Sequence, residues 1–348
     1  MTKSINDNPQ NKVKFYPDTI PIVFSSNDYY IPYMSTMMQS IMENSNPNKH
    51  YCFFILYREI ESNNIDLIKK HLSGFPKFSV EFIDVTQYFK GYNFFISGNY
   101  TAEVYFRLLI PYTFSEYKKV IYLDGDMLCC TDISFLFDID IKDFILAGVI
   151  DLYIISFFYY QNFTDDDEKH KFDILLNLKK PYNYINSGLL IFNIELFNKT
   201  ISMEKLFDLA QSHEWQFHDQ DILNFLFEEN TLLLSLNWNL LNSTHSRLKY
   251  LPIHLQNEIS EAVKNPKIIH YKPWNCENYI LHFELFWKYA TRTPFINDII
   301  ERMKKKDIFS EETFPDRIIS NIKHRKGIGL RFILIDCLKA WFTRDKKK

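Results

Sequence analysis

Short, almost uninterrupted apolar segments alternate with amphipathic segments over roughly the first 115 of the 348 residues. Residues 20–25, 51–57 and 80–85 predict strands, and residues 33–43 and 62–72 between them predict helices. A strand that is apolar at every position is buried on both faces, which is typical of parallel strands covered by helices. The chain is therefore expected to begin with a parallel α/β half.

The same alternation continues at wider spacing towards the C-terminus. A helix is predicted at residues 101–109, ending at Pro111, because proline interrupts a helix interior. Three further strands are predicted at residues 120–123, 144–150 and 189–194, and two short ones at 232–236 and 268–271. Two more helices are predicted at residues 204–211 and 219–227.

A glycine-rich phosphate loop is missing from this α/β half. The chain has only 8 glycines, and neither GxGxxG nor the P-loop pattern occurs in it. If the α/β half binds a nucleotide, its phosphates must be neutralised in another way. A bound metal ion is the usual alternative.

Cysteine content and hydropathy bear on the compartment. Five cysteines are scattered without a CxxC pair, which indicates free thiols rather than a disulfide framework. The first residues, MTKSINDNPQNKVK, are polar and lack the apolar core of a signal peptide. The most apolar stretch, residues 152–163, is shorter than the ~18 residues that a membrane span needs. We expect a cytoplasmic protein.

Charge is distributed unevenly along the chain. Residues 322–348 contain nine Lys or Arg and two Asp, a net +7, which leaves −10 on the remaining residues. An acidic body repels phosphate, so nucleic acid is not an expected partner. Apolar residues at 330–342 can form one broad helical face beside basic ones, which predicts contact with an anionic membrane surface. The alternative is a final helix packed on the body.

The triplet Asp124-Gly125-Asp126 directly follows the apolar strand predicted at residues 120–123. Ligands of open α/β sheets bind at the carboxyl ends of the strands, and two carboxylates there offer hard oxygen ligands to a divalent cation. The pattern alone is weak, because three other D-x-D triplets occur in the chain. Asp-Gly is also a hairpin-turn signal, so a purely structural turn is the alternative.

His270 lies near the end of the last predicted strand, residues 268–271, and is followed by Tyr271, Lys272, Pro273 and Trp274. A histidine in this position is often only a core residue. Its imidazole can also complete a metal site with the two aspartates, and a nitrogen ligand favours Mn²⁺ over Mg²⁺, which stays the alternative ion. Lys272 can oppose a phosphate as a point charge.

Ordered sequence blocks extend these motifs over roughly residues 20–295. They are IVFSSNDYY from residue 22, YFRLLIP from 105, VIYLDGDML from 120, AGVID from 147, YINSGLLIFNI from 184, HDQDILN from 218, IIHYKPWN from 268 and WKYATRTPF from 287. In this order and spacing the chain resembles glycosyltransferase family 8, especially its bacterial lipopolysaccharide galactosyl- and glucosyltransferases. The resemblance implies an α/β fold of GT-A type, a nucleotide-diphospho-sugar transferase domain with a Rossmann-like N-terminal half.

Domain boundaries follow from the resemblance and the composition together. Residues 1–18 are expected to be a polar N-terminal extension, and residues 19–300 the GT-A glycosyltransferase domain. Residues 301–348 are expected to form a C-terminal helical, basic amphipathic region that associates with the membrane.

The resemblance also implies residues that bind the nucleotide. Ser25, Asn27 and Tyr30 would line the uracil and ribose site, and Arg107 would lie near the donor, where it can pair with phosphate or sugar hydroxyls. Asn27 stands where the family frequently has aspartate. An amide can still donate and accept, so UDP remains the expected nucleotide. Ordinary packing is the alternative role of Tyr30.

Metal binding is implied for Asp124, Asp126 and His270, which would hold Mn²⁺ across both phosphates of the donor. Lys272 would bind the diphosphate. The family commonly places several residues between its metal histidine and the Lys-Pro-Trp sequence, whereas His270 and Lys272 are nearly adjacent here. This departure weakens the expected phosphate role of Lys272.

Contacts with the donor sugar are implied for Asp151 and Asn186, while Asp219 and Gln220 would face the anomeric carbon, with Asp221 beside them. Structural alternatives exist for these residues also. Carboxylates at the start of the helix predicted at 219–227 stabilise it through capping and the helix dipole. The segment that begins at Asn186 can be a turn.

The implied activity is retaining transfer of a galactose or glucose from a UDP-sugar to a saccharide acceptor, a bacterial lipooligosaccharide or lipopolysaccharide core. A lipid-linked acceptor would suit the basic tail and a peripheral position on the cytoplasmic face of the inner membrane. The alternatives are a carbohydrate-binding scaffold on the same fold, a self-glucosylating transferase like glycogenin, and a nucleotidyltransferase or sugar-nucleotide hydrolase. The last lacks a basic loop near SSNDYY.

Overall fold

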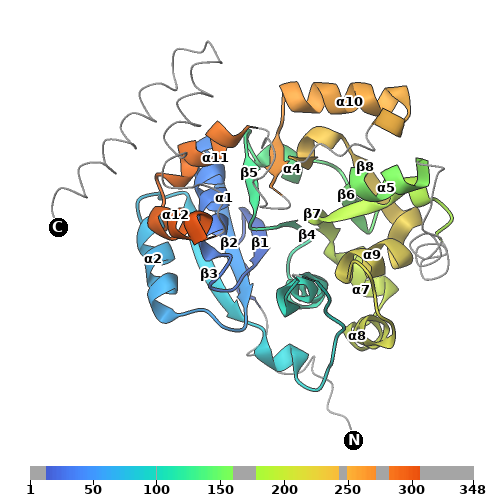
Figure 1. The fold of residues 1–348 in the computed structure, drawn as a ribbon. Helices are drawn as coiled ribbons and strands as arrows, with labels where there is room; N and C mark the ends of the chain where they lie inside the picture. Colours follow the sequence, from blue (N-terminus) through green and yellow to red (C-terminus); the bar gives the residue numbers. More distant parts are fainter. Residues whose placement is uncertain (1–12, 99, 160–177, 243–248, 272–281, 306–348) are drawn as a thin grey trace, which may run out of the picture.

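The computed structural model describes residues 13–98, 100–159, 178–242, 249–271 and 282–305. A seven-stranded sheet runs through the molecule in the order β3-β2-β1-β4-β7-β6-β8, with helices on both of its faces (Figure 1). Its strands are β1 (Thr19–Ser25), β2 (His50–Tyr57), β3 (Phe78–Asp84), β4 (Lys119–Leu123), β6 (Leu146–Ile150), β7 (Ile185–Asn193) and β8 (Thr231–Leu234). The predicted α/β class is confirmed.

The N-terminal half has the predicted parallel arrangement. β1 pairs in parallel with β2 and with β4, and β2 pairs in parallel with β3. Consecutive residues of β1, such as Ile22 and Val23, point to opposite faces and are both fully buried, because α1 (Ile31–Asn44) and α2 (Ser62–Leu72) belong to the layers that cover the sheet. The predicted helices at 33–43 and 62–72 correspond to α1 and α2.

The parallel arrangement predicted for the N-terminal half does not continue through the rest of the sheet. β7 runs antiparallel to both of its neighbours, β4 and β6, while β8 is parallel to β6. A strand buried on both faces is apolar throughout whichever way it runs, so its direction is not visible in the sequence. The antiparallel course has a structural consequence: the start of β7 lies at the edge where β4 and β6 end (Figure 1).

A second, three-stranded sheet has the order β5-β10-β9, made of β5 (Met127–Cys129), β10 (Ile268–His270) and β9 (Leu240–Leu241). β10 is antiparallel to β5, with His270 opposite Met127, and parallel to β9. The predicted strand 268–271 therefore ends one residue earlier. Strands as short as β5 and β9 carry too few residues for a recognisable pattern.

The helix predicted at 101–109 differs from the prediction in type and in its end. It is the 3-10 helix η4 (Ala102–Leu109), which passes directly into α3 (Ile110–Thr113). Pro111 therefore does not end a helix but lies in the first turn of α3, where its missing N–H has no partner to lose. The helices predicted at 204–211 and 219–227 are α8 (Met203–Ser212) and α9 (Asp219–Phe227).

The remaining regular elements are mostly short. They are η3 (Thr86–Phe89), α4 (Ser134–Phe137), α5 (Leu152–Tyr159), η5 (Pro181–Asn183), α7 (Ile194–Thr200), η6 (Glu228–Asn230), η7 (Leu236–Trp238), α10 (Ile253–Lys264), α11 (Phe283–Ala290) and α12 (Ile296–Lys305). None of the helices within the described ranges has both the length and the apolar character needed to span a membrane. Of the predicted tail at 301–348, only the start falls in α12, and residues 306–348 lie outside the described residues.

Candidate active site

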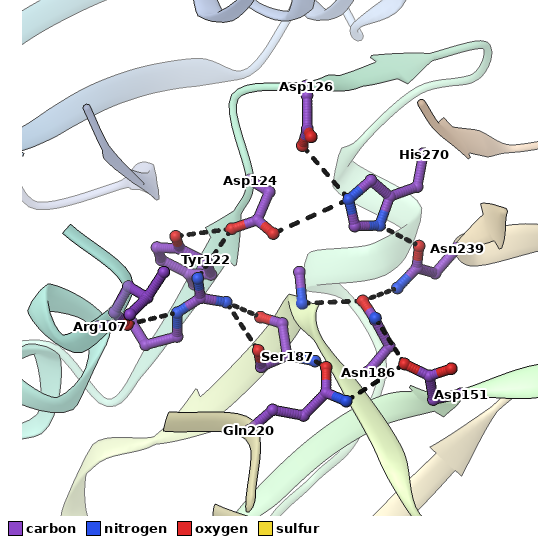
Figure 2. A network of polar contacts seen from close by, with 12 residues as sticks. Arg107, Tyr122, Asp124, Asp126, Asp151, Asn186, Ser187, Gln220, Asn239 and His270 are labelled. Atoms are coloured by element: carbon purple, nitrogen blue, oxygen red, sulfur yellow. Dashed lines mark hydrogen bonds and ion pairs between the residues drawn. The ribbon is translucent and has the colours of Figure 1, made fainter. Parts of the chain in front are cut away.

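The candidate residues gather at the edge of the large sheet where β1, β4 and β6 end. A pocket opens there, and seven of the predicted site residues line it: Ser25, Tyr30, Arg107, Asp124, Asp126, Asp219 and Gln220. His270, Asn186 and Asp151 are buried next to these residues, and Figure 2 shows them in one network with the pocket residues.

Asp124, Asp126 and His270 converge on one point. Their ligand atoms all lie within 4.8 Å of one another. His270 Nε2 lies 3.2 Å from Asp126 Oδ1 and 3.8 Å from Asp124 Oδ2 (Figure 2). Among the described residues, this buried nitrogen has no hydrogen-bond partner, so its position would suit a metal bond. Two carboxylates and an imidazole therefore fit a divalent cation in number, donor chemistry and spacing.

The turn that carries the two aspartates joins two sheets. Asp124 follows β4 of the large sheet, and Asp126 precedes β5, which pairs with β10 instead of folding back on β4. The Asp-Gly hairpin suggested by the sequence is therefore not formed. The Asp126 carbonyl accepts a hydrogen bond from the N–H of Tyr271 at 3.0 Å, which holds the turn beside the end of β10. The pairing of β5 with β10 explains how Asp126 and His270, which are far apart in the sequence, come to lie side by side.

Arg107 is 4% exposed and binds two carboxylates of the site. Nη2 is 3.0 Å from Asp124 Oδ1, and Nε is 3.0 Å from Asp219 Oδ2. Nη1 donates to the carbonyl and, at 3.0 Å, to Oγ of Ser187, and the guanidinium stacks on the ring of Tyr122 (Figure 2). Burial lowers the pKa of Arg107, but the two carboxylates raise it by more, so the group stays charged.

Asp124 is oriented by these neighbours. Its Oδ1 accepts hydrogen bonds from Tyr122 Oη at 2.8 Å and from Arg107. The other oxygen, Oδ2, is directed towards His270 (Figure 2). Tyr122 and Ser187 were not singled out in the sequence, because a tyrosine inside an apolar strand and a serine beside a glycine carry no motif of their own.

Asp151, Asn186 and Gln220 form the second cluster of the site. Asp151 Oδ2 accepts from Asn186 Nδ2 at 2.9 Å and from Gln220 Nε2 at 3.2 Å. Gln220 Oε1 accepts from the N–H of Ser187 at 3.0 Å. Asn186 and Ser187 lie within β7, so the suggested turn at Asn186 is not present.

The start of α9 carries two carboxylates that also contact the site. Asp219 and Asp221 occupy its first turn, where negative charge suits the helix dipole, but the N-cap residue His218 makes no side-chain capping hydrogen bond. Asp221 accepts from Tyr184 Oη at 2.5 Å and from the N–H of Phe217 at 2.7 Å. Burial raises the pKa of Asp221 to about 6, although both hydrogen bonds lower it. His218, the residue directly before α9, has a φ of 51°, a positive value that is uncommon for a residue with a side chain.

Three of the predicted nucleotide residues lie at or just after the end of β1, which closes with Ser25. Ser25 and Tyr30 line the pocket. Asn27 Oδ1 instead accepts from the N–H groups of Tyr29 and Tyr30 at 3.0 and 3.2 Å, which orders the turn into α1. The remaining candidate, Lys272, lies outside the described residues.

Comparison with known proteins agrees with this architecture. A family model, Glycosyl transferase family 8, matches residues 21–277. Glycosyltransferase GlyB of Streptococcus pneumoniae is 28% identical over 314 residues, which cover 88% of this chain and 69% of that protein. The lipopolysaccharide 1,2-glucosyltransferase of Escherichia coli is 22% identical over 326 residues, 88% of this chain and 91% of that protein.

The structure also resembles the apo structure of the WbbM bifunctional glycosyltransferase. The TM-score is 0.74 at 25% identity, over 83% of this chain and 52% of that one, so this chain spans about half the length of WbbM. The fold, the position of the candidate site at the carboxyl ends of β1, β4 and β6, and the family match support one assignment. The chain belongs to glycosyltransferase family 8 and is a glycosyltransferase with the GT-A fold.

Proposed function

We propose that this protein is a metal-dependent, retaining hexosyltransferase that moves galactose or glucose from a UDP-sugar to a saccharide acceptor. The observation that carries this proposal is the convergence of Asp124, Asp126 and Nε2 of His270, a buried nitrogen that makes no hydrogen bond among the described residues. These three side chains would hold the cation, with Mn²⁺ favoured over Mg²⁺ by the imidazole ligand. When bound, the cation would neutralise negative charge on the diphosphate leaving group.

The residues around the metal site would divide the remaining tasks. Asp151 and Asn186 would receive hydroxyls of the donor sugar, and Gln220 and Asp219 would face its anomeric carbon. Arg107 would support the site without contacting the donor directly, because each of its nitrogens already contacts Asp124, Asp219 or Ser187. It compensates two carboxylates that would otherwise repel the diphosphate.

Retention does not require a protein nucleophile in this site. Gln220 carries an amide, which is a poor nucleophile, and its Oε1 accepts a backbone hydrogen bond. Asp219 is ion-paired with Arg107 at 3.0 Å, which lowers the nucleophilicity of its carboxylate. Attack of the acceptor on the same face as the departing diphosphate is therefore the mechanism that these residues support best.

The proposed acceptor is a lipooligosaccharide or lipopolysaccharide core. Similarity to the lipopolysaccharide 1,2-glucosyltransferase supports it. A lipid-linked acceptor would be reached from the cytoplasmic face of the inner membrane, where the basic residues of 301–348 would bind anionic lipid. Most of that tail lies outside the described residues, so this part of the proposal rests on its sequence.

The test is UDP release from a panel of UDP-sugars with and without Mn²⁺, for the wild type and Asp126→Ala. We expect turnover of UDP-galactose or UDP-glucose that requires metal and is lost in the variant. Asp140→Ala, in another D-x-D triplet with a 68% exposed side chain, serves as the control and should keep full activity. If no nucleotide sugar is bound or turned over with metal present, the scaffold alternative replaces this proposal. An increase in intact mass with donor alone would indicate self-glucosylation.

A further inference from the structure

A continuous chain of hydrogen bonds leads from His270 to Asp151 through two amide side chains (Figure 2). His270 Nδ1 is 3.1 Å from Asn239 Oδ1, and Asn239 Nδ2 is 2.9 Å from Asn186 Oδ1. Asn186 Nδ2 is in turn 2.9 Å from Asp151 Oδ2. Asn239, between η7 and β9, is 4% exposed and belongs to none of the sequence motifs.

Main-chain groups determine which atom donates and which accepts in each of these hydrogen bonds. The N–H of Gly188 can only donate, and it lies 3.0 Å from Asn186 Oδ1, so that atom is the carbonyl oxygen. The amide nitrogen of Asn186 then faces Asp151. Asp151 Oδ2 must accept there, because an NH₂ group can only donate, while Oδ1 accepts from the N–H groups of Tyr153 and Ile154 at 3.0 and 3.1 Å.

The orientation of Asn239 follows from that of Asn186. Only the NH₂ group of Asn239 can donate to Asn186 Oδ1, so Asn239 presents its carbonyl oxygen to His270. A carbonyl oxygen accepts but cannot donate, and His270 Nδ1 must therefore carry the proton. In a neutral imidazole the lone pair then belongs to Nε2, the atom that faces Asp124 and Asp126.

Backbone pairing keeps Asn239 beside the histidine. β9 and β10 are parallel neighbours, with Leu241 opposite His270. The N–H of Asn242 donates to the His270 carbonyl at 3.0 Å, and the N–H of Lys267 donates to the Asn237 carbonyl at 2.8 Å. These bonds on both sides of Asn239 hold its side chain at a fixed place along β10.

We infer that Asn239 is a positioning residue, which holds His270 as the Nδ1–H tautomer with the Nε2 lone pair aimed between the two aspartates. The inference rests on the proposed metal site for its purpose, but the tautomer itself is a property of the metal-free protein. Partners of this kind on the outer nitrogen of a metal-binding histidine fix its orientation and raise its basicity.

The first measurement is the tautomer of His270 in metal-free, ¹⁵N-labelled protein, read from long-range ¹H–¹⁵N correlations recorded at a pH where these show a singly protonated ring. The resonance is assigned by its loss in His270→Gln. We expect Nδ1–H in the wild type and in Asn239→Asp, which keeps the acceptor. Asn239→Leu should show a mixture or Nε2–H, whereas the same substitution at the neighbouring Asn237 should change nothing.

The second measurement is Mn²⁺ affinity in the presence of UDP, followed by the electron paramagnetic resonance signal of the free ion. Asn239→Leu is expected to weaken binding about 10- to 100-fold, and Asn239→Asp by no more than a few-fold. If Asn239→Leu does not fold, the wild type and Asn239→Asp still decide the question through the tautomer.

Each outcome has a distinct meaning. An Nε2–H tautomer in the wild type, or an unchanged tautomer or Mn²⁺ affinity in Asn239→Leu, overturns the role of Asn239. Absence of Mn²⁺ binding by the wild type with UDP present would instead overturn the proposed function, while the tautomer result would still stand for Asn239.

Discussion

Gly188 passes so close to His270 that a methyl group on its Cα would lie 2.6 Å from Cε1 of the imidazole. The same methyl group would lie 2.9 Å from Asp124 Oδ2 and 2.9 Å from Asn186 Oδ1. The main chain of β7 thus forms the floor of the proposed metal site. It is also bonded to it, because the Gly188 carbonyl accepts from the N–H of Asp124 at 2.7 Å.

Gly188→Ala is therefore expected to displace two proposed metal ligands at once. A shift of about 1 Å in catalytic groups can cost on the order of 100-fold in rate. We expect at least that loss in kcat/KM for UDP-sugar turnover, with weaker Mn²⁺ binding in a titration. Gly74→Ala is the matched control, because its methyl group would meet only the His71 carbonyl at 3.7 Å. Full activity in Gly188→Ala would show that the site relaxes freely.

Arg107→Met should destabilise the metal-free protein strongly. The substitution leaves the carboxylates of the buried Asp219 and the mostly buried Asp124 without their cation, and breaking a buried pair in this way costs about 3–5 kcal/mol. Urea unfolding in the presence of a chelator measures it. Arg292→Met removes an ion pair to Glu43 from a side chain that is 43% exposed and should cost no more than about 1 kcal/mol. Equal losses in the two variants would contradict this assignment.

The raised pKa of Asp221 predicts a pH dependence of stability. The folded-state pKa of about 6 exceeds the ordinary value of 3.8, so the folded protein holds the proton more tightly. This contribution is complete below about pH 4 and is lost as the pH rises through about 6, a change of roughly 3 kcal/mol. Asp221→Asn should flatten the free energy of unfolding over this range, whereas the exposed Asp66→Asn should not. The same slope in wild type and Asp221→Asn would exclude Asp221 as its source.

Removal of the residues after Arg325 should abolish binding to liposomes that contain anionic lipid, because seven of the nine basic residues in 322–348 and the apolar face at 330–342 are lost. UDP-sugar hydrolysis should be unaffected, since the described residues of the candidate site lie between Ser25 and His270, well before the truncation. Co-sedimentation with anionic and with neutral vesicles measures this. Undiminished binding of the truncated protein to anionic vesicles would assign the membrane contact to another part of the chain.

Local pattern was enough to predict the strands and helices from β1 to β3 and to single out the three residues of the proposed metal site. The apolar strands β1 and β2 are visible because burial on both faces leaves a continuous signal. The convergence of Asp124 and His270 could be expected because each ends an apolar strand. The direction of β7 could not, since a fully buried strand reads the same either way.

Roles that depend on tertiary contacts were not predictable. Asn239 and His270 are 31 residues apart and meet only because β9 pairs with β10. Arg107 was expected near the donor, yet its main partners are two carboxylates contributed by β4 and α9. A single sequence names the residue types that a site needs, while the bonds among them depend on strand pairing.

Three consecutive residues of β7 each serve a different part of the site. Asn186 binds Asp151, Ser187 binds Arg107, and Gly188 lies against His270. A shift of one position along this strand would exchange the faces of all three. Under the proposed assignment, the groups that would meet the donor sugar and the metal ion are therefore held in place by the register of one strand.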